Sequence, residues 1–92
     1  MRPYHITETS AVLAQYTAAS AELLAELGRT VYPALAEDAV NDTGRYPILY
    51  DRGGWYTFRI ETPGGGLHFL LYQAIEEERR VLVFSVVTVR EP

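Results

Sequence analysis

The sequence predicts an α+β fold in which a helical hairpin packs on one face of a four-stranded, mainly antiparallel sheet, in the order β-α-α-β-β-β. Three observations lead to this prediction. Apolar residues recur at helical spacing in the first half of the chain, alternate with polar residues after residue 54, and fill both faces of the last strand. Residues 1–92 are expected to form a single domain, because a chain of this length has no room for a second core.

The first half of the chain reads as a short strand followed by a helix. Residues 3–7 alternate between apolar and polar side chains, which predicts the strand. Thr9 or Ser10 then offers an N-cap, and apolar residues follow at helical spacing as far as Leu27. Gly28 is expected either to end this helix as a C-cap or to break it, because glycine readily adopts the backbone conformation of a C-cap and is unfavourable inside a helix.

A second helix is predicted over residues 31–40. Its apolar residues fall on one face, and Pro33 suits its first turn. These apolar residues are Val31, Leu35 and Ala39. The two helices would form a hairpin with an apolar inner side.

The second half of the chain is predicted to form strands, because every second residue there is apolar, which is the spacing of side chains on one face of a strand. Strands are predicted at residues 48–50 (a weak one), 55–61, 67–75 and 81–90. The glycine-rich segment 63–66 and the charged run 76–80 are expected to be the two reversals that make these strands antiparallel.

The last strand is the strongest guide to topology. Residues 81–89 are apolar on both faces except at Ser85 and Thr88. Such a strand belongs inside a sheet, because an exposed edge of this composition would invite aggregation. The N-terminal strand is left to pair beside it, and the connection through both helices is long enough for a crossover.

Composition narrows the classes of function. The chain carries 8 basic and 12 acidic residues, a net charge of −4, and all of its basic residues are arginines. This balance argues against a general nucleic-acid binder, which needs a basic surface. We expect a cytoplasmic protein without a membrane span, because no apolar run is long enough for one. We also expect no cofactor and no metal, since cysteine is absent and the two histidines lie far apart in sequence.

The strand and turn pattern resembles the RelE branch of the RelE/ParE superfamily, the toxins of bacterial toxin–antitoxin pairs. The resemblance rests on the strand at residues 67–75, the acidic turn, and the run Val81–Val87, with residues 55–60 in the place of the family's first meander strand. It implies a toxin that arrests growth by acting on ribosome-bound mRNA, or on DNA gyrase as in the ParE branch. It also implies neutralisation by an antitoxin protein.

The resemblance further implies a catalytic site of basic residues that stabilise charge on the scissile phosphate. Arg59 matches the family's basic residue on the first meander strand, His68 lies nearest the arginine that begins the next strand, and Arg90 matches the arginine that ends the last strand. Many family members complete the site with a tyrosine in a C-terminal extension. No counterpart follows in this sequence, so we expect an incomplete ribonuclease site, and whether the chain is an enzyme stays open.

A second hypothesis is a non-catalytic interaction module on the same fold, either a degenerate toxin or a homodimeric binding protein. The low basic content and the mixed polarity of the strand at residues 55–61 motivate it. Aromatic residues are enriched at interfaces. We therefore expect partner-binding residues at Trp55, Tyr56 and Tyr72.

Overall fold

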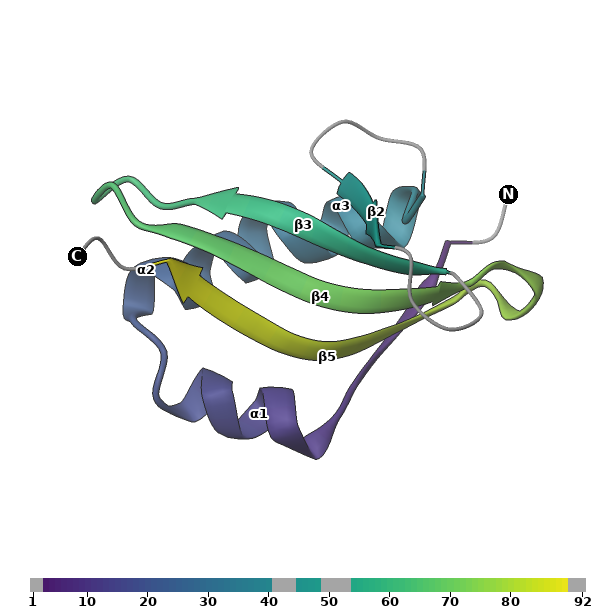
Figure 1. Ribbon diagram of the computed structural model, residues 1–92, viewed down its shortest axis with the longest axis horizontal. Coiled ribbons are helices and arrows are strands. Elements are labelled where there is room, and N and C mark those ends of the chain that lie inside the picture. Colours follow the sequence, from purple (N-terminus) through teal and green to yellow (C-terminus); the bar gives the residue numbers. More distant parts are fainter. Residues whose placement is uncertain (1–2, 41–44, 49–53, 90–92) are drawn as a thin grey trace.

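The computed structural model of the protein describes residues 3–40, the backbone of residues 45–48, and residues 54–89. Its strands are β1 (His5–Glu8), β2 (Arg45–Ile48), β3 (Trp55–Glu61), β4 (Leu67–Ile75) and β5 (Arg80–Val89). Its helices are α1 (Ser10–Thr17), α2 (Ala21–Glu26) and α3 (Tyr32–Glu37). In the sheet the strands lie in the order β1-β5-β4-β3-β2, with α2 and α3 behind one face and α1 beside β5 (Figure 1).

The predicted fold class and the order of its elements are confirmed. β1 pairs with β5 in parallel, and the other neighbouring strands are antiparallel. The sheet has five strands rather than the four of the predicted fold, because the weak strand that the sequence indicated is formed as β2 and pairs with the first half of β3. The weak strand was predicted three residues too late, and residues 49–53 lie outside the described part of the chain. Pro47 weakens the strand pattern here, although proline is tolerated in an edge strand such as β2.

β5 contains a bulge that changes which side chains face the helices. Tyr72 of β4 is paired with Val83, but its neighbour Leu71 is paired with Ser85, so Phe84 is the extra residue. Before the bulge the odd-numbered residues of β5 are buried, and after it Val86 is buried. A β-bulge has this effect because one added residue shifts the alternation of side chains by one.

The first helix ends earlier than predicted. Thr9 is its N-cap, as expected, and accepts a hydrogen bond from the N–H of Val12 at 3.2 Å. The helix stops at Thr17, and a new helix starts after Ser20, whose hydroxyl accepts from the N–H of Leu23. This break lets α1 stay beside β5 while the second helical segment turns away along the sheet (Figure 1).

Gly28 does not end the helical segment, so the predicted C-cap is wrong. The alternative of a break agrees with the structure, because a π-helical turn, Leu27–Val31, interrupts the α-helix between α2 and α3. In this turn the N–H of Tyr32 bonds to the carbonyl of Leu27, five residues earlier. Pro33 follows directly and has no N–H to donate, so a wider turn before it accommodates the lost helical bond.

The core lies between the helices and the sheet. The helices contribute most of the apolar residues that recur at helical spacing, although Leu13 and Leu24 of that pattern are exposed, and alternate residues of the strands face the helices. The core residues of the helical segments are Val12, Leu23, Leu27, Val31 and Leu35, and those of the strands are Ile60, Leu70, Tyr72, Ala74, Val81, Val83 and Val86. Ala39 is also buried, but it follows α3, which ends at Glu37 rather than at the predicted residue 40. Among the described residues, the helices are all too short or too polar to cross a membrane.

A chain of polar side chains connects β1, α1 and α3 at the side of this core. The hydroxyl of Tyr32 donates to Oε2 of Glu8 at 2.8 Å, and the hydroxyl of Tyr16 lies 2.7 Å from that of Tyr32. Because Tyr32 already donates to the carboxylate, Tyr16 is the donor of the second bond. Burial raises the pKa of both tyrosines, and for Tyr32 the bonds to Tyr16 and Glu8 raise the pKa further.

Replacing Tyr32 with phenylalanine is therefore expected to destabilise the fold by about 1–3 kcal/mol, because the change leaves two half-buried polar groups without their partner. Tyr16→Phe removes one bond and leaves the contact between Tyr32 and Glu8 intact. It should lower the free energy of unfolding by only about 1 kcal/mol. Urea unfolding at pH 7 measures both values. Equal losses for the two variants would contradict a chain in which Tyr16 donates to Tyr32 and Tyr32 donates to Glu8.

The raised pKa values also predict how stability depends on pH. A tyrosine whose pKa is higher in the folded than in the unfolded chain adds stability that is complete below about pH 10 and is lost at higher pH. The urea concentration at the midpoint of unfolding should therefore decrease as the pH is raised above about 10. This decrease should be shallower in the Tyr16→Phe/Tyr32→Phe double variant. Part of the fall should remain, because burial also raises the pKa of Tyr4 and Tyr56. Identical alkaline profiles would contradict the assignment.

Candidate functional site

Arg59 lies on the face of the sheet that no described helix covers, which we call the open face. Its Nη2 is 2.6 Å from Oε1 of Glu61, two residues along the same strand, and both side chains are substantially exposed. The two residues line a shallow pocket of about 350 Å³ beside the turn between β3 and β4. An exposed arginine of this kind can meet an anionic ligand, but it must first exchange Glu61 for that ligand.

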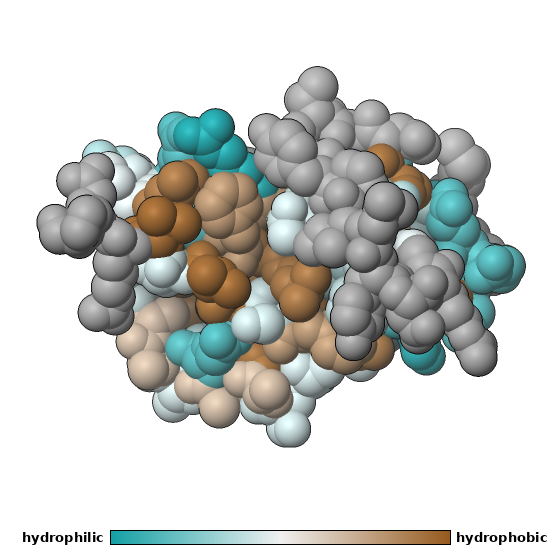
Figure 2. Space-filling view, viewed as in Figure 1, coloured by the Kyte–Doolittle hydropathy of each residue, from teal (hydrophilic) through white to brown (hydrophobic). Residues whose placement is uncertain are grey.

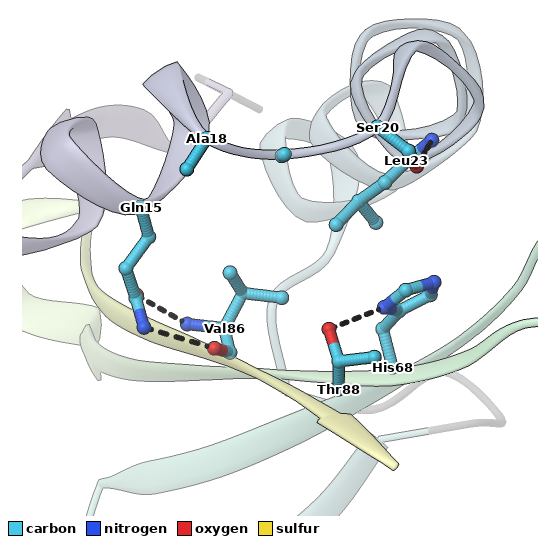
Figure 3. Close-up of a pocket in the computed structure, with 8 residues that line it drawn as sticks. Gln15, Ala18, Ser20, Leu23, His68, Val86 and Thr88 are labelled. Atoms are coloured by element: carbon cyan, nitrogen blue, oxygen red, sulfur yellow. Dashed lines mark hydrogen bonds between the residues drawn. The ribbon is translucent and has the colours of Figure 1, made fainter. Parts of the chain in front are cut away.

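His68 lies on the other face of the sheet, toward the helices. It is paired with Ile60 and is 7% exposed. Its Nδ1 is 2.9 Å from the hydroxyl oxygen of Thr88. Figure 3 shows the ring in the wall of a pocket between β5 and the connection from α1 to α2.

The structure therefore does not bring Arg59 and His68 together. The register pairs Arg59 with Phe69 and Ile60 with His68, so neighbouring residues of β4 point to opposite faces. A phosphate that contacts Arg59 on the open face is separated from His68 by the sheet itself. Arg90, the third residue of the predicted site, lies outside the described residues.

The aromatic residues predicted to bind a partner divide in the same way. Tyr72 is fully buried, and its hydroxyl donates to the carbonyl of Ala39 at 2.7 Å. Tyr56 packs against the core and stacks on Tyr72, with 5.7 Å between the ring centroids. The prediction of Tyr72 as a partner contact is wrong for the folded chain, because the side chain faces the helices. Trp55 lies on the open face and is half-buried against Phe84, with 4.6 Å between the centroids of the two rings.

The open face carries a patch of apolar side chains. Figure 2 shows them gathered over the middle of this face. Val87 and Val89 of β5 are 56% and 46% exposed, and Phe69 and Leu71 of β4 lie half-buried on the same side. A contiguous apolar patch on a surface is typical of a site that contacts another macromolecule.

The outer edge of β5 holds an arrangement that the sequence pattern did not predict. β1 accompanies β5 only as far as Val83. Beyond it, the hydroxyl of Thr9 donates to the carbonyl of Phe84 at 3.2 Å. The side-chain amide of Gln15 then donates to the carbonyl of Val86 at 3.0 Å and accepts from its N–H at 2.8 Å (Figure 3). Gln15 thus makes the hydrogen bonds that a residue of a further strand would make.

A weak signal for this role exists in the sequence. Gln15 follows the buried Val12 by three residues and therefore lies toward the same side of α1. A side-chain amide on this side of the helix can donate to and accept from the backbone of the element that lies beside it. The sequence does not identify that element, because the spacing within the helix says nothing about which strand lies beside it.

Comparisons with known proteins identify the fold. No protein-family model and no curated protein matches the sequence. One chain of the RelBE2 toxin–antitoxin complex of Mycobacterium tuberculosis is similar in structure, with a TM-score of 0.76 and 18% identity over 95% of this chain and 99% of that one. The isolated RelE toxin of E. coli is similar with a TM-score of 0.69 and 18% identity, over 97% of this chain and 87% of that one.

A mutant of the E. coli toxin RelE, solved in complex with a peptide of its antitoxin RelB, is also similar. The TM-score is 0.69 at 20% identity, over 98% of this chain and 86% of that one. The likeness extends along nearly the whole chain in all three cases. The chain therefore has the RelE-like toxin fold.

Because Arg59 and His68 lie on opposite faces of the sheet, their replacement should affect the stability of the fold differently. Arg59→Ala should change the free energy of unfolding by less than about 0.5 kcal/mol, because exposed ion pairs contribute little. His68→Ala should lower it by about 2 kcal/mol, because removal of the buried ring leaves a cavity. Chemical unfolding of the two variants checks this, and a larger loss for Arg59→Ala would contradict the assignment of faces.

Proposed function

We propose that this chain is the toxin of a type II toxin–antitoxin pair, arresting growth in the bacterial cytoplasm until an antitoxin protein binds it. The observation that carries this proposal is the structural likeness to the isolated E. coli RelE toxin over nearly the whole chain. The likeness to a RelE mutant bound to a peptide of its antitoxin supports a protein partner. A shared fold alone can host several functions, so the proposal is tested in cells.

Two targets fit the proposal, namely ribosome-bound mRNA and DNA gyrase. Cleavage of mRNA needs cations that stabilise charge at the scissile phosphate. Arg59 is the candidate for this role on the open face, with Arg90 as its predicted companion. The ion pair with Glu61 weakens Arg59 as a phosphate ligand, because a carboxylate neutralises the guanidinium. His68 stays a predicted catalytic residue, but from its buried position it would act on a different face from Arg59.

A non-catalytic interaction module is the second candidate function, either as a degenerate toxin or as a homodimer. The apolar patch on the open face favours it, because exposed valines suit a protein surface better than a phosphate backbone. Under this hypothesis the functional residues are Trp55, Val87 and Val89 rather than the arginines.

Growth after induction of the chain from a tightly controlled promoter tests the proposal. We expect growth to stop, and Arg59→Ala to restore it if the target is mRNA. Glu61→Gln is the matched variant, because it frees the guanidinium and should strengthen an activity that depends on Arg59. Continued growth with the protein present in folded form would contradict the toxin proposal.

Two further assays distinguish action on the ribosome from action on gyrase. Cut mRNA in a translating lysate identifies action on the ribosome, whereas intact mRNA with blocked DNA supercoiling identifies gyrase. Growth arrest that survives Arg59→Ala but is lost in Val87→Asp would favour the interaction module.

A further inference from the structure

We propose that the outer edge of β5 beyond Val86, with the pocket beside it, is the docking site for an extended peptide segment of a partner protein. The segment would pair its backbone with Thr88 and place an uncharged side chain in the pocket. The identification of this partner as the antitoxin rests on the function proposed above, whereas the docking site follows from the geometry of β5.

The first line of evidence is an unused pair of main-chain groups. Both the N–H and the C=O of Val86 point away from β4, since both bond to Gln15. Every second residue of a strand directs its main chain to the same side, so the N–H and C=O of Thr88 also point to the outer edge. Among the described residues none bonds to them there, and such groups are a template for an added strand.

The second line of evidence is the pocket. Its volume is about 390 Å³, and it lies between the end of β5 and the connection from α1 to α2 (Figure 3). Its lining consists of small, apolar or uncharged polar side chains, together with His68. These residues are Gln15, Ala18, Ala19, Ser20, Leu23, His68, Val86 and Thr88. Without a carboxylate, lysine or arginine in this lining, the pocket suits an uncharged side chain.

The two features fit one occupant. The side chain of Thr88 points to the pocket, and residues paired across two strands place their side chains on the same face. A residue paired with Thr88 would therefore direct its own side chain into the pocket. A helix could fill the pocket, but it would leave the edge groups of Thr88 unpaired, because a helix satisfies its main chain internally.

The surroundings favour a single extended segment over a second sheet. α1 lies beside β5, and Gln15 occupies the edge at Val86, so the open stretch is short (Figure 1). A second copy of this chain would bring its own α1 to the same place. An extended segment is slender enough to lie between α1 and the end of β5.

A library of random twelve-residue peptides, displayed on phage and panned against the intact chain, tests the inference. Thr88→Pro removes the outward N–H without removing a bond to β4, and proline is tolerated at such an edge. The recovered peptides should bind Thr88→Pro about tenfold more weakly than Thr88→Val, the matched variant that also lacks the hydroxyl but keeps the N–H. Ala18→Arg, which fills the pocket, should weaken binding similarly, whereas Ala14→Arg on the exposed side of the same helix should not.

Several outcomes would overturn the inference. These are recovery of no binding peptide, equal binding to Thr88→Pro and Thr88→Val, or peptides that become helical when they bind. A dimer of the chain that dissociates in Thr88→Pro would also overturn it, because the edge would then belong to a second copy. Circular dichroism and thermal melting confirm that each variant is folded before its binding is measured.

A separate readout distinguishes failure of this inference from failure of the proposed function. If the induced chain does not arrest growth but the peptides bind the edge of β5, the docking site stands and the toxin proposal fails. If growth is arrested, survivors selected from a genomic library identify a neutralising protein. If that protein binds Thr88→Pro as tightly as Thr88→Val, the proposed docking site is contradicted, whereas the toxin proposal stands.

Discussion

The main-chain hydrogen bonds of β5 are the constraint on which the rest of this fold depends. β5 has ten residues, whereas β1, its outer neighbour, has only four. Unpaired backbone groups beside a packed core are costly, so the remaining edge must be completed by other means. Thr9 and Gln15 complete it as far as Val86, and Gln15 can do so because α1 lies beside the strand. α1 thus takes part in completing this edge, and the pocket lies between the end of β5 and the connection that follows α1.

The register of β5 also determines which side chains lie on the same face of the sheet. The bulge at Phe84 keeps valines directed at the helices along the strand, although the alternation shifts there by one residue. The open face then receives Phe84, Val87 and Val89, which accompany Trp55 and Arg59. The face toward the helices receives His68 and Thr88. The protein therefore presents two separate surfaces, an apolar face that also carries Arg59 and a pocket at the edge of the sheet.

Much of the fold was predictable because its signals are local and repeated. The period of two between Trp55 and Val89, interrupted by a glycine-rich turn and a charged turn, marks three strands whose ends agree with the structure to within a residue. The two apolar faces of the last strand correctly required a neighbour on each side, and β1 is that neighbour. The core residues Val31, Leu35 and Ala39 were predictable from their spacing for the same reason, although α3 ends before Ala39.

The candidate site was less predictable, because it depends on register rather than on pattern. Whether Arg59 and His68 share a face depends on how many residues the turn takes up, and alternation within each strand does not give that number. Gly28 is an example of tertiary packing overriding local preference, since Leu27, Val31 and Leu35 bury one continuous helical face across it. The role of Gln15 depends on a contact with a residue 71 positions away, which no local pattern contains.

Amide hydrogen exchange at Val86 is the measurement that tests most directly whether Gln15 completes the edge of β5. If it does, the amide of Val86 is protected in the unaltered chain. In Gln15→Ala it should exchange about fivefold faster or more, because the loss of one such bond corresponds to about 1 kcal/mol or more. The amide of Tyr72, in the neighbouring strand, should keep its protection and report that the fold is intact. A Val86 amide that exchanges equally fast with and without the glutamine would contradict this role of Gln15.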